Sequence, residues 1–269
     1  MPGKRSLILT ALVALLIPAS AVTPANSADS GSSGRSSFRV LVFSKTTGFR
    51  HDSIPDGIVA IQKLGRQNGF AVDTTEDATR FTDRNLARYR AVVFLSSTGD
   101  PLGEPAQKEA FERYIERGGG FAGVHAAADS GYEWPWYGGL VGAYFRSHPE
   151  QQNATVVVTG RGAPSSRGLP RRWTRFDEWY NYQANPRADG VRVLMTLDER
   201  SYDVGPDAMG DHPIAWCHRY DGGRAWYTGL GHTKESYTDP LFLNHLLGGI
   251  EMAAGAAAFP CGADNSGGA

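Results

Sequence analysis

The sequence predicts an α/β fold in which a mainly parallel sheet is flanked by helices and carries extra antiparallel strands in its C-terminal half. From residue 38 to about 126, short apolar runs alternate with helical patterns across short connections, which is typical of a parallel sheet. The run at 91–97 begins with five consecutive apolar residues, as expected of a strand buried on both faces. Strand-like runs then dominate up to residue 230, which predicts the antiparallel part.

The first strand and helix follow from local composition. Residues 38–44 form a short, β-branched apolar run, which favours a strand. A helix is expected to start near Ser53, because Pro55 suits a first helical turn and apolar residues at 58, 61 and 64 recur on one face. The further predicted strands are 71–76, 91–97, 119–126, 154–159, 176–182, 191–197, 212–220 and 223–230.

Two more helices are predicted from their ends and faces. One spans about 105–117, with a buried apolar stripe and Gly118 as its stop signal. The last begins with Asp239 as N-cap and Pro240 in the first helical position, and it continues to Ala254.

The N-terminus has the layout of a secretory signal peptide. Lys4 and Arg5 precede an apolar run, and small residues follow up to Ala28. Cleavage there would remove both basic residues and no acid, so 27 − 2 = 25 basic against 28 acidic side chains leave a net charge of −3. We therefore expect a secreted, extracellular protein. The predicted organisation is a signal peptide at 1–28, a Gly/Ser linker at 29–37, one domain at 38–256 and a tail at 257–269.

Charge and hydropathy argue against two kinds of partner. The 27 basic and 28 acidic side chains of the 269 residues are nearly balanced, so there is no basic footprint for nucleic acid. No stretch after the signal approaches the ~20 apolar residues of a membrane helix, so no membrane partner is expected after cleavage. In an oxidising compartment Cys217 and Cys261 most simply pair as a disulfide, the alternative being two unrelated thiols.

Polar side chains follow several predicted strands. Since ligands of open parallel sheets bind outside the carboxyl ends of the strands, these residues are the first candidates for a site. They include Lys45, Arg50, His51, Asp100, His125, Asp129, His232 and Glu235.

The turn around His125 carries the most chemical information. A strand enters it directly, and Gly123 and Ala127 flank the histidine, which resembles the tight turn of a nucleophile elbow. A histidine there can act as a general base or acid, or as a metal ligand. The alternative is a buried histidine that is hydrogen-bonded within the turn.

Five motifs in order resemble the ThuA-like (trehalose utilisation) family over roughly residues 38–255. They are FRVLVFSKTTGFRHDSI, GGGFAGVHAAADS, FDEWYNY, HPIAW and GRAWYTGLGHTKESYTDPLFLNHLLGGIEMAAG. The resemblance implies a flavodoxin-like fold similar to class I glutamine amidotransferases, with the elbow at its centre. Those enzymes carry Cys at the elbow, whereas this chain has His125, so glutaminase chemistry is not expected.

The resemblance also implies a small carbohydrate as the ligand, in disaccharide catabolism and routes through 3-keto-sugars. Aromatic rings beside carboxylates are suited to stacking sugar rings and binding their hydroxyls; in each case the alternative is ordinary core packing. The candidate substrate-binding residues are Arg50, Asp129, Trp134, Trp136, Glu178, Tyr180 and His212.

The candidate catalytic residues are His125 as base or ligand, His51 and His232 as its partners, and Glu235. Glu235 or Glu178 is expected to orient an imidazole or a sugar hydroxyl. Such a set suits a sugar hydrolase, lyase or isomerase that works by histidine acid/base chemistry. The alternative is a non-catalytic carbohydrate-binding or cell-surface module, which needs the aromatic residues but not three histidines together.

The histidines also raise the possibility of a divalent metal site, and no other cofactor is indicated. The spacing has no compact signature, so a Zn²⁺ site would have to be assembled from separate loops. His245 is expected to be structural because it lies inside the last predicted helix, and His148 and His218 have a weaker context.

Overall fold

A computed structural model describes residue 3, residues 38–187 and residues 190–262. Apart from residue 3, the predicted signal peptide and linker lie outside the described residues, as does the tail beyond residue 262. The strands are β1 (Phe38–Phe43), β2 (Phe70–Thr75), β3 (Ala91–Leu95), β4 (Gly120–Val124), β5 (Phe145–Ser147), β6 (Gln152–Val158), β7 (Arg172–Asp177), β8 (Asn181–Tyr182), β9 (Arg192–Asp198), β10 (Pro213–Tyr220) and β11 (Gly223–Thr228). The α-helices are α1 (Ile54–Asn68), α2 (Asp83–Leu86), α3 (Pro105–Glu116), α4 (Pro135–Val141) and α5 (Pro240–Ala253). The 3₁₀ helices are η1 (Ala78–Arg80), η2 (His125–Asp129), η3 (Pro164–Ser166), η4 (Glu199–Ser201) and η5 (Lys234–Thr238).

Nine strands form one mixed sheet in the order β2-β1-β3-β4-β11-β10-β9-β6-β7. The neighbours from β2 to β11 are parallel, and every later pair is antiparallel. The fold class predicted from the sequence is therefore confirmed. The order of the first four strands is that of flavodoxin-like sheets, in which ligands bind at the carboxyl ends of the strands.

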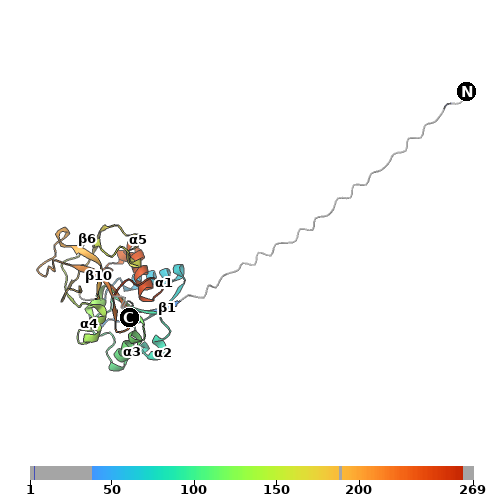
Figure 1. The fold of residues 1–269 in the computed structure, drawn as a ribbon, viewed down its shortest axis with the longest axis horizontal. Coiled ribbons are helices and arrows are strands. Elements are labelled where there is room, and N and C mark those ends of the chain that lie inside the picture. Colours follow the sequence, from blue (N-terminus) through green and yellow to red (C-terminus); the bar gives the residue numbers. More distant parts are fainter. Residues whose placement is uncertain (1–2, 4–37, 188–189, 263–269) are drawn as a thin grey trace, which may run out of the picture. The chain divides into compact units, whose positions relative to one another are not determined.

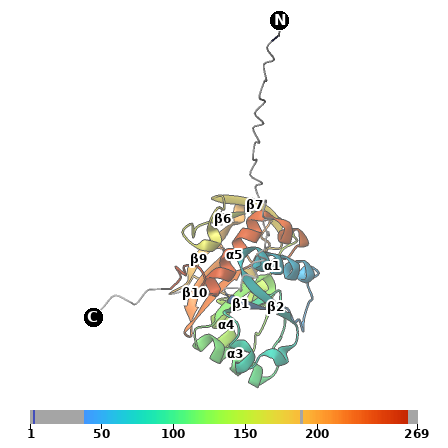
Figure 2. The same cartoon turned by 90° about the vertical axis from the view of Figure 1, so that its right-hand side faces the viewer.

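Helices cover both faces of the parallel part. On one face α5 packs against β4, β11 and α1 (Figures 1 and 2). On the other face the ring of Phe111 of α3 stacks on the ring of Phe94 of β3, with the ring centroids 5.2 Å apart, and α4 contacts β11. Burial on both sides explains the continuous apolar composition of β3, all five residues of which are buried.

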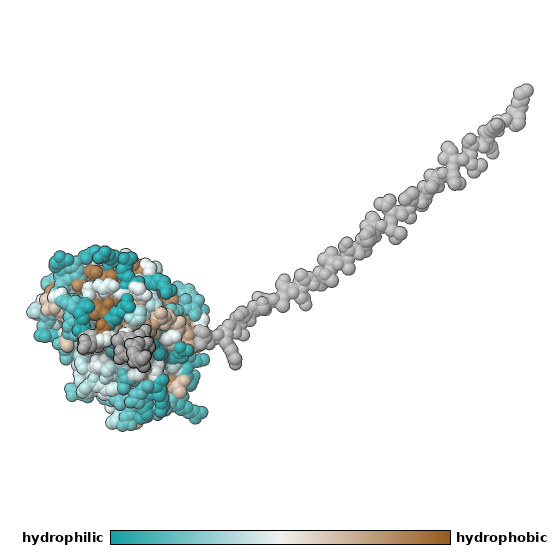
Figure 3. All heavy atoms as spheres, viewed as in Figure 1, coloured by the Kyte–Doolittle hydropathy of each residue, from teal (hydrophilic) through white to brown (hydrophobic). Residues whose placement is uncertain are grey.

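The surface is mainly hydrophilic on the face shown in Figure 3. Hydrophobic residues that reach it gather over the region of β6 and β10. None of the helices in the described part of the chain has both the length and the apolar character needed to span a bilayer.

Two local predictions differ from the structure. The run 176–182, predicted as one strand, forms only the end of β7 and then β8, because residues 178–180 leave the ladder. The short helix α4 was not predicted, since two glycines among its seven residues weaken the helical signal. The predicted cap of the last helix is confirmed, because the Asp239 side chain accepts a hydrogen bond from the backbone N–H of Leu241 at 2.9 Å.

The predicted disulfide is confirmed. Cys217 of β10 and Cys261 are bonded, with their Cα atoms 5.6 Å apart. The bond fastens the chain after α5 to the middle of the antiparallel part of the sheet.

His245 is buried inside α5 and gives the fold a dependence on pH. Its Nδ1 lies 2.8 Å from the carbonyl oxygen of Ser165, and burial lowers the pKa of His245 to about 4. Between about pH 6.5 and about pH 4 the unfolded chain binds a proton here that the folded chain does not. This single group should therefore lower the free energy of unfolding by about 3 kcal/mol as the pH falls through that window.

The variant His245→Asn should lose this part of the pH dependence, because an asparagine amide can donate to the Ser165 carbonyl without titrating. Urea denaturation of both proteins at about pH 7 and about pH 4 measures the difference. An equal loss of stability in the two proteins would show that His245 is not the group responsible.

Candidate functional site

Four chain segments meet at one edge of the sheet. Strands β1, β4 and β11 run parallel, so the loops that follow them carry His51, His125 and His232 to the same edge. Four antiparallel steps separate β7 from β11, so both run in the same direction. Glu178, the residue directly after β7, therefore lies at the same end of the sheet as the three histidines.

His125 is the first residue of η2 and forms a strained turn directly after β4. Its φ of +50° lies in the left-handed region, which is uncommon for residues other than glycine. The turn is packed tightly from below, since a Cβ on Gly123 would lie 2.9 Å from the ring of Tyr227. The Tyr227 hydroxyl donates to the carbonyl oxygen of His125 at 2.8 Å. This packing holds the imidazole out over the sheet, as the predicted elbow requires.

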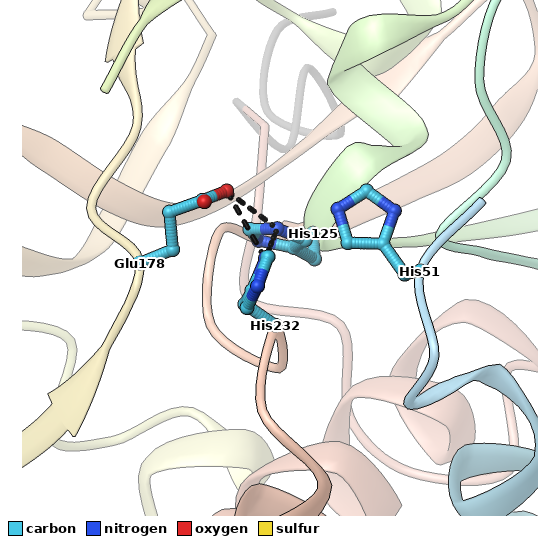
Figure 4. A group of neighbouring side chains, drawn as sticks. All are labelled: His51, His125, Glu178 and His232. Atoms are coloured by element: carbon cyan, nitrogen blue, oxygen red, sulfur yellow. Dashed lines mark hydrogen bonds and ion pairs between the residues drawn. The ribbon is translucent and has the colours of Figure 1, made fainter. Parts of the chain in front are cut away.

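His51, His125, His232 and Glu178 together form what we call the histidine centre (Figure 4). The His125 Nε2 atom lies 3.1 Å from His232 Nδ1 and 3.3 Å from Glu178 Oε2. His232 Nδ1 is 3.1 Å from the same carboxylate oxygen. One ligand atom from each of the four residues lies within 4.8 Å of the others. The structure thus brings together the three histidines that the sequence singled out.

Hydrogen bonds define the state of the His125 ring. Its Nδ1 lies 2.9 Å from the carbonyl oxygen of Gly229. Because a carbonyl oxygen can only accept, Nδ1 carries the proton, and in the neutral ring the Nε2 lone pair faces Glu178 and His232. The ring of Tyr180 covers His125, with the ring centroids 4.3 Å apart.

The charges of the centre are strongly coupled. Burial opposes ionisation of Glu178, but the neighbouring imidazoles of His125 and His232 outweigh it and hold the pKa of the carboxyl below its usual range. Burial also opposes protonation of His232, yet the Glu178 carboxylate raises the pKa of this imidazole. Burial, reinforced by His125 and His232, lowers the pKa of His51 to about 2, so this imidazole is neutral.

A cavity of about 410 Å³ opens above the centre. Phe49, Phe145 and Tyr180 contribute aromatic rings to its wall, and Asp129, His148 and Gln151 contribute polar groups. His148 Nδ1 lies 3.4 Å from Glu178 Oε1, and the Gln151 amide lies 2.8 Å from His232 Nε2. The cavity therefore combines aromatic faces with groups that can hydrogen-bond.

Asp177 ties two parts of the centre together. Its buried carboxylate accepts hydrogen bonds from the backbone N–H groups of Gly231 and His232, both at 3.0 Å. Arg175 balances the charge through an ion pair of 3.1 Å. Because Glu178 follows Asp177 directly, this one side chain positions Glu178 and His232 relative to each other.

Several predicted residues lie elsewhere. The Glu235 side chain is exposed on η5, and Glu178 supplies the carboxylate of the centre instead. Arg50 is paired with Glu76 at 2.7 Å. Trp134 and Trp136 stack on each other and donate their indole N–H groups to Glu112 and Asp221. Neither tryptophan lines the cavity, and these contacts are of the kind expected for the packing alternative that the sequence left open.

His212 is not in the cavity lining either. It is buried, with Nδ1 2.9 Å from a carboxylate oxygen of Glu199 and Nε2 2.9 Å from the carbonyl oxygen of Tyr180. It therefore supports the backbone of Tyr180. Of the substrate-binding candidates, Asp129, Glu178 and Tyr180 line the cavity.

The sequence interpretation missed Phe49, Phe145 and Gln151. Phe49 precedes His51 by two residues and is 66% exposed, so its position next to a strand end was the available signal. Phe145 and Gln151 lie in a region without a recognisable pattern, and only the tertiary structure brings them to the centre.

Comparisons with known proteins agree with this architecture. The sequence matches the ThuA family, described as trehalose utilisation, over residues 39–253. A putative ThuA-like protein from Bacteroides uniformis is 27% identical with a TM-score of 0.69, and the match covers 86% of this chain and 95% of that one. A putative ThuA-like protein from Parabacteroides merdae is 19% identical with a TM-score of 0.67, and the match covers 82% and 91%.

A β-galactosidase from Bacillus circulans shares the fold, with 15% identity, a TM-score of 0.55 and coverage of 83% of this chain and 32% of that one. Comparison with curated proteins finds no match. The family match spans most of the chain and agrees with the described fold, so the chain belongs to the ThuA family, whose description indicates a carbohydrate-related role.

Proposed function

We propose that the chain is an exported enzyme that modifies a small saccharide by proton transfer at the histidine centre. One observation carries this proposal: three imidazoles and a carboxylate converge beneath a cavity that also has aromatic walls. A binding module would have no use for such a buried and strongly coupled set of groups. Perturbed titratable groups in a cleft favour a reaction centre.

The chemistry that suits the centre is proton transfer next to a carbonyl or hydroxyl group. Enolisation, epimerisation or β-elimination of a keto-sugar needs a base near neutral pH and a group that stabilises the developing negative charge. The centre and the polar groups beside it, His148 and Asp129, can supply both. The Asp129 carboxyl has a raised pKa because it is partly buried, which favours a role in exchanging protons.

The cavity suits a sugar in size and surface. Its volume of about 410 Å³ lies in the usual range for small-molecule sites. The ring of Phe49 stands edge-on to His51, with the ring centroids 4.9 Å apart, and offers an exposed face beside the centre. The C–H face of a saccharide can stack there while its hydroxyls reach Asp129, His148 and Gln151.

Two features support export. The N-terminal residues have the signal-peptide pattern, and the Cys217–Cys261 disulfide is of the kind that persists in oxidising compartments. The mass of the protein recovered from the medium of a producing culture tests export and the cleavage site together.

The function is tested by incubating the purified chain with a panel of disaccharides and 3-keto-glycosides and identifying products by mass spectrometry. A product that forms in proportion to enzyme concentration is the expected result. Saccharide binding in calorimetry without any product would overturn the enzyme proposal in favour of a carbohydrate-binding module.

A matched pair of variants locates the substrate. Phe49→Ala should raise KM by about 2- to 10-fold with little change in kcat, because an aromatic stacking contact is worth roughly 0.5–1.5 kcal/mol. Phe176→Ala is the control, since Phe176 is 49% exposed but lies on the outward side of β7. Steady-state kinetics of both variants distinguish the two positions. Equal KM values for Phe49→Ala and the wild type would place the substrate elsewhere.

A further inference from the structure

We propose that the histidine centre binds one divalent transition-metal ion of the zinc class. His125 Nε2, His232 Nδ1 and Glu178 Oε2 would be its ligands, and His51 would stand at the fourth side. The inference deepens the proposed function, on which only the catalytic role of the ion rests. Binding of the ion can be measured without any substrate.

The separations of the three ligand atoms fit an ion. With bonds of about 2.0–2.1 Å, ligand atoms lie about 3.3 Å apart in a tetrahedral site and about 2.9 Å apart when the bonds meet at right angles. The three separations in the centre are 3.1, 3.1 and 3.3 Å. One ion can therefore contact all three atoms without a change in the backbone.

The surroundings resemble those of metal-ligating histidines. Such residues usually donate their other ring N–H to a carbonyl, carboxylate or similar acceptor, which fixes the ring for coordination. His125 does this through the carbonyl oxygen of Gly229, which lies 2.9 Å from its Nδ1. The backbone of His232 is held by Asp177. The ligands are thus oriented before an ion binds.

His51 provides an independent observation. It is 4% exposed, and among the described residues its buried Nδ1 has no hydrogen-bond partner. A buried polar atom without a partner is costly. The ring points toward the other members of the centre and lies edge-on to both imidazoles, with centroids 4.9 Å from His125 and 5.0 Å from His232 (Figure 4). Binding to the ion, directly or through a water ligand of the ion, would give the imidazole of His51 a polar partner.

The donor set indicates the class of ion and its use. Imidazole nitrogens with one carboxylate favour zinc and neighbouring transition metals over magnesium or calcium, which prefer oxygen ligands. Three protein ligands with one open side are typical of catalytic sites. An ion there would polarise a saccharide oxygen in the cavity, and proton transfer would then pass to His148 and Asp129.

The test uses the full chain, stripped of metal by dialysis against a chelator and then titrated with Zn²⁺ and with Co²⁺. We expect one ion per chain by elemental analysis and a Co²⁺ absorption spectrum that reports nitrogen and oxygen ligands. Glu178→Gln and His232→Ala should weaken binding by at least about 100-fold, the upper end of the loss seen when a residue behind a ligand is removed.

His245→Asn is the matched control, because His245 is a buried histidine bonded to a backbone carbonyl but lies outside the centre. Its metal affinity should equal that of the wild type. The inference is overturned if the wild type binds no stoichiometric Zn²⁺ or Co²⁺, or if folded Glu178→Gln and His232→Ala proteins bind as tightly as the wild type. Turnover that persists after the metal is removed would reject the ion's catalytic role and leave the proposed function intact. One bound ion without turnover of any saccharide would support the metal site and reject the proposed function.

Discussion

Replacing His125 with asparagine is expected to reduce saccharide turnover by about 10²- to 10⁴-fold, the usual size of a loss of acid/base catalysis, because His125 is either the base itself or a ligand of the ion that assists proton transfer. Asparagine is chosen because it tolerates the left-handed backbone of this turn, where His125 has a φ of +50°. Its amide can also donate to the Gly229 carbonyl in place of Nδ1. Activity should therefore fall while the protein stays folded.

Steady-state assays of His125→Asn are compared with assays of His245→Asn, which changes a buried histidine remote from the cavity lining. We expect the second variant to keep wild-type activity at neutral pH. Thermal denaturation of both proteins controls for folding. Wild-type turnover by a folded His125→Asn protein would remove His125 from the reaction centre.

Removing the disulfide is expected to lower the free energy of unfolding by about 4 kcal/mol. Cys217 and Cys261 are 44 residues apart, and in the chain-entropy model a loop of this length restricts the unfolded state by that amount. For a domain of this size the loss corresponds to a fall in Tm of about 8–16 °C. Calorimetry of the Cys217→Ala/Cys261→Ala double variant measures it.

The double variant should be insensitive to reductant, whereas the wild type should approach its stability after reduction in denaturant. Both cysteines are buried, so reduction of the folded protein is expected to be slow. A double variant as stable as the wild type would mean that the disulfide does not contribute to the free energy of unfolding, and that packing alone holds the two segments together.

The core elements of the fold were predictable because their signals are local. The apolar run of β3, the cap of α5 and the stop after α3 depend on residues within one turn or strand. The irregular segment 178–180 and the helix α4 were not, because tertiary packing overrides weak local preferences there. An unbroken strand through residue 178 would have given Glu178 a place in the ladder rather than in the centre.

The site was predictable in part. His51, His125 and His232 follow parallel strands, and the rule that such ends share one edge was enough to group them. The carboxylate partner was ambiguous. Glu235 lies close to His232 in sequence, whereas Glu178 follows β7, which is the outermost strand of the antiparallel part of the sheet. The structure selects Glu178.

Local sequence patterns thus predicted the α/β class and the three histidines, because strand ends and turns depend on near neighbours. The disulfide pair was predicted from the presence of two cysteines in an expected oxidising compartment. Only the tertiary structure shows that Glu178 completes the histidine centre, that Gln151 contacts it, and that Trp134 and Trp136 lie outside the cavity lining. The physical reason is that these positions depend on where the antiparallel strands end relative to the carboxyl ends of the parallel strands. Contacts between segments that are distant in sequence, such as those of Asp177 with the backbone of Gly231 and His232, determine that placement.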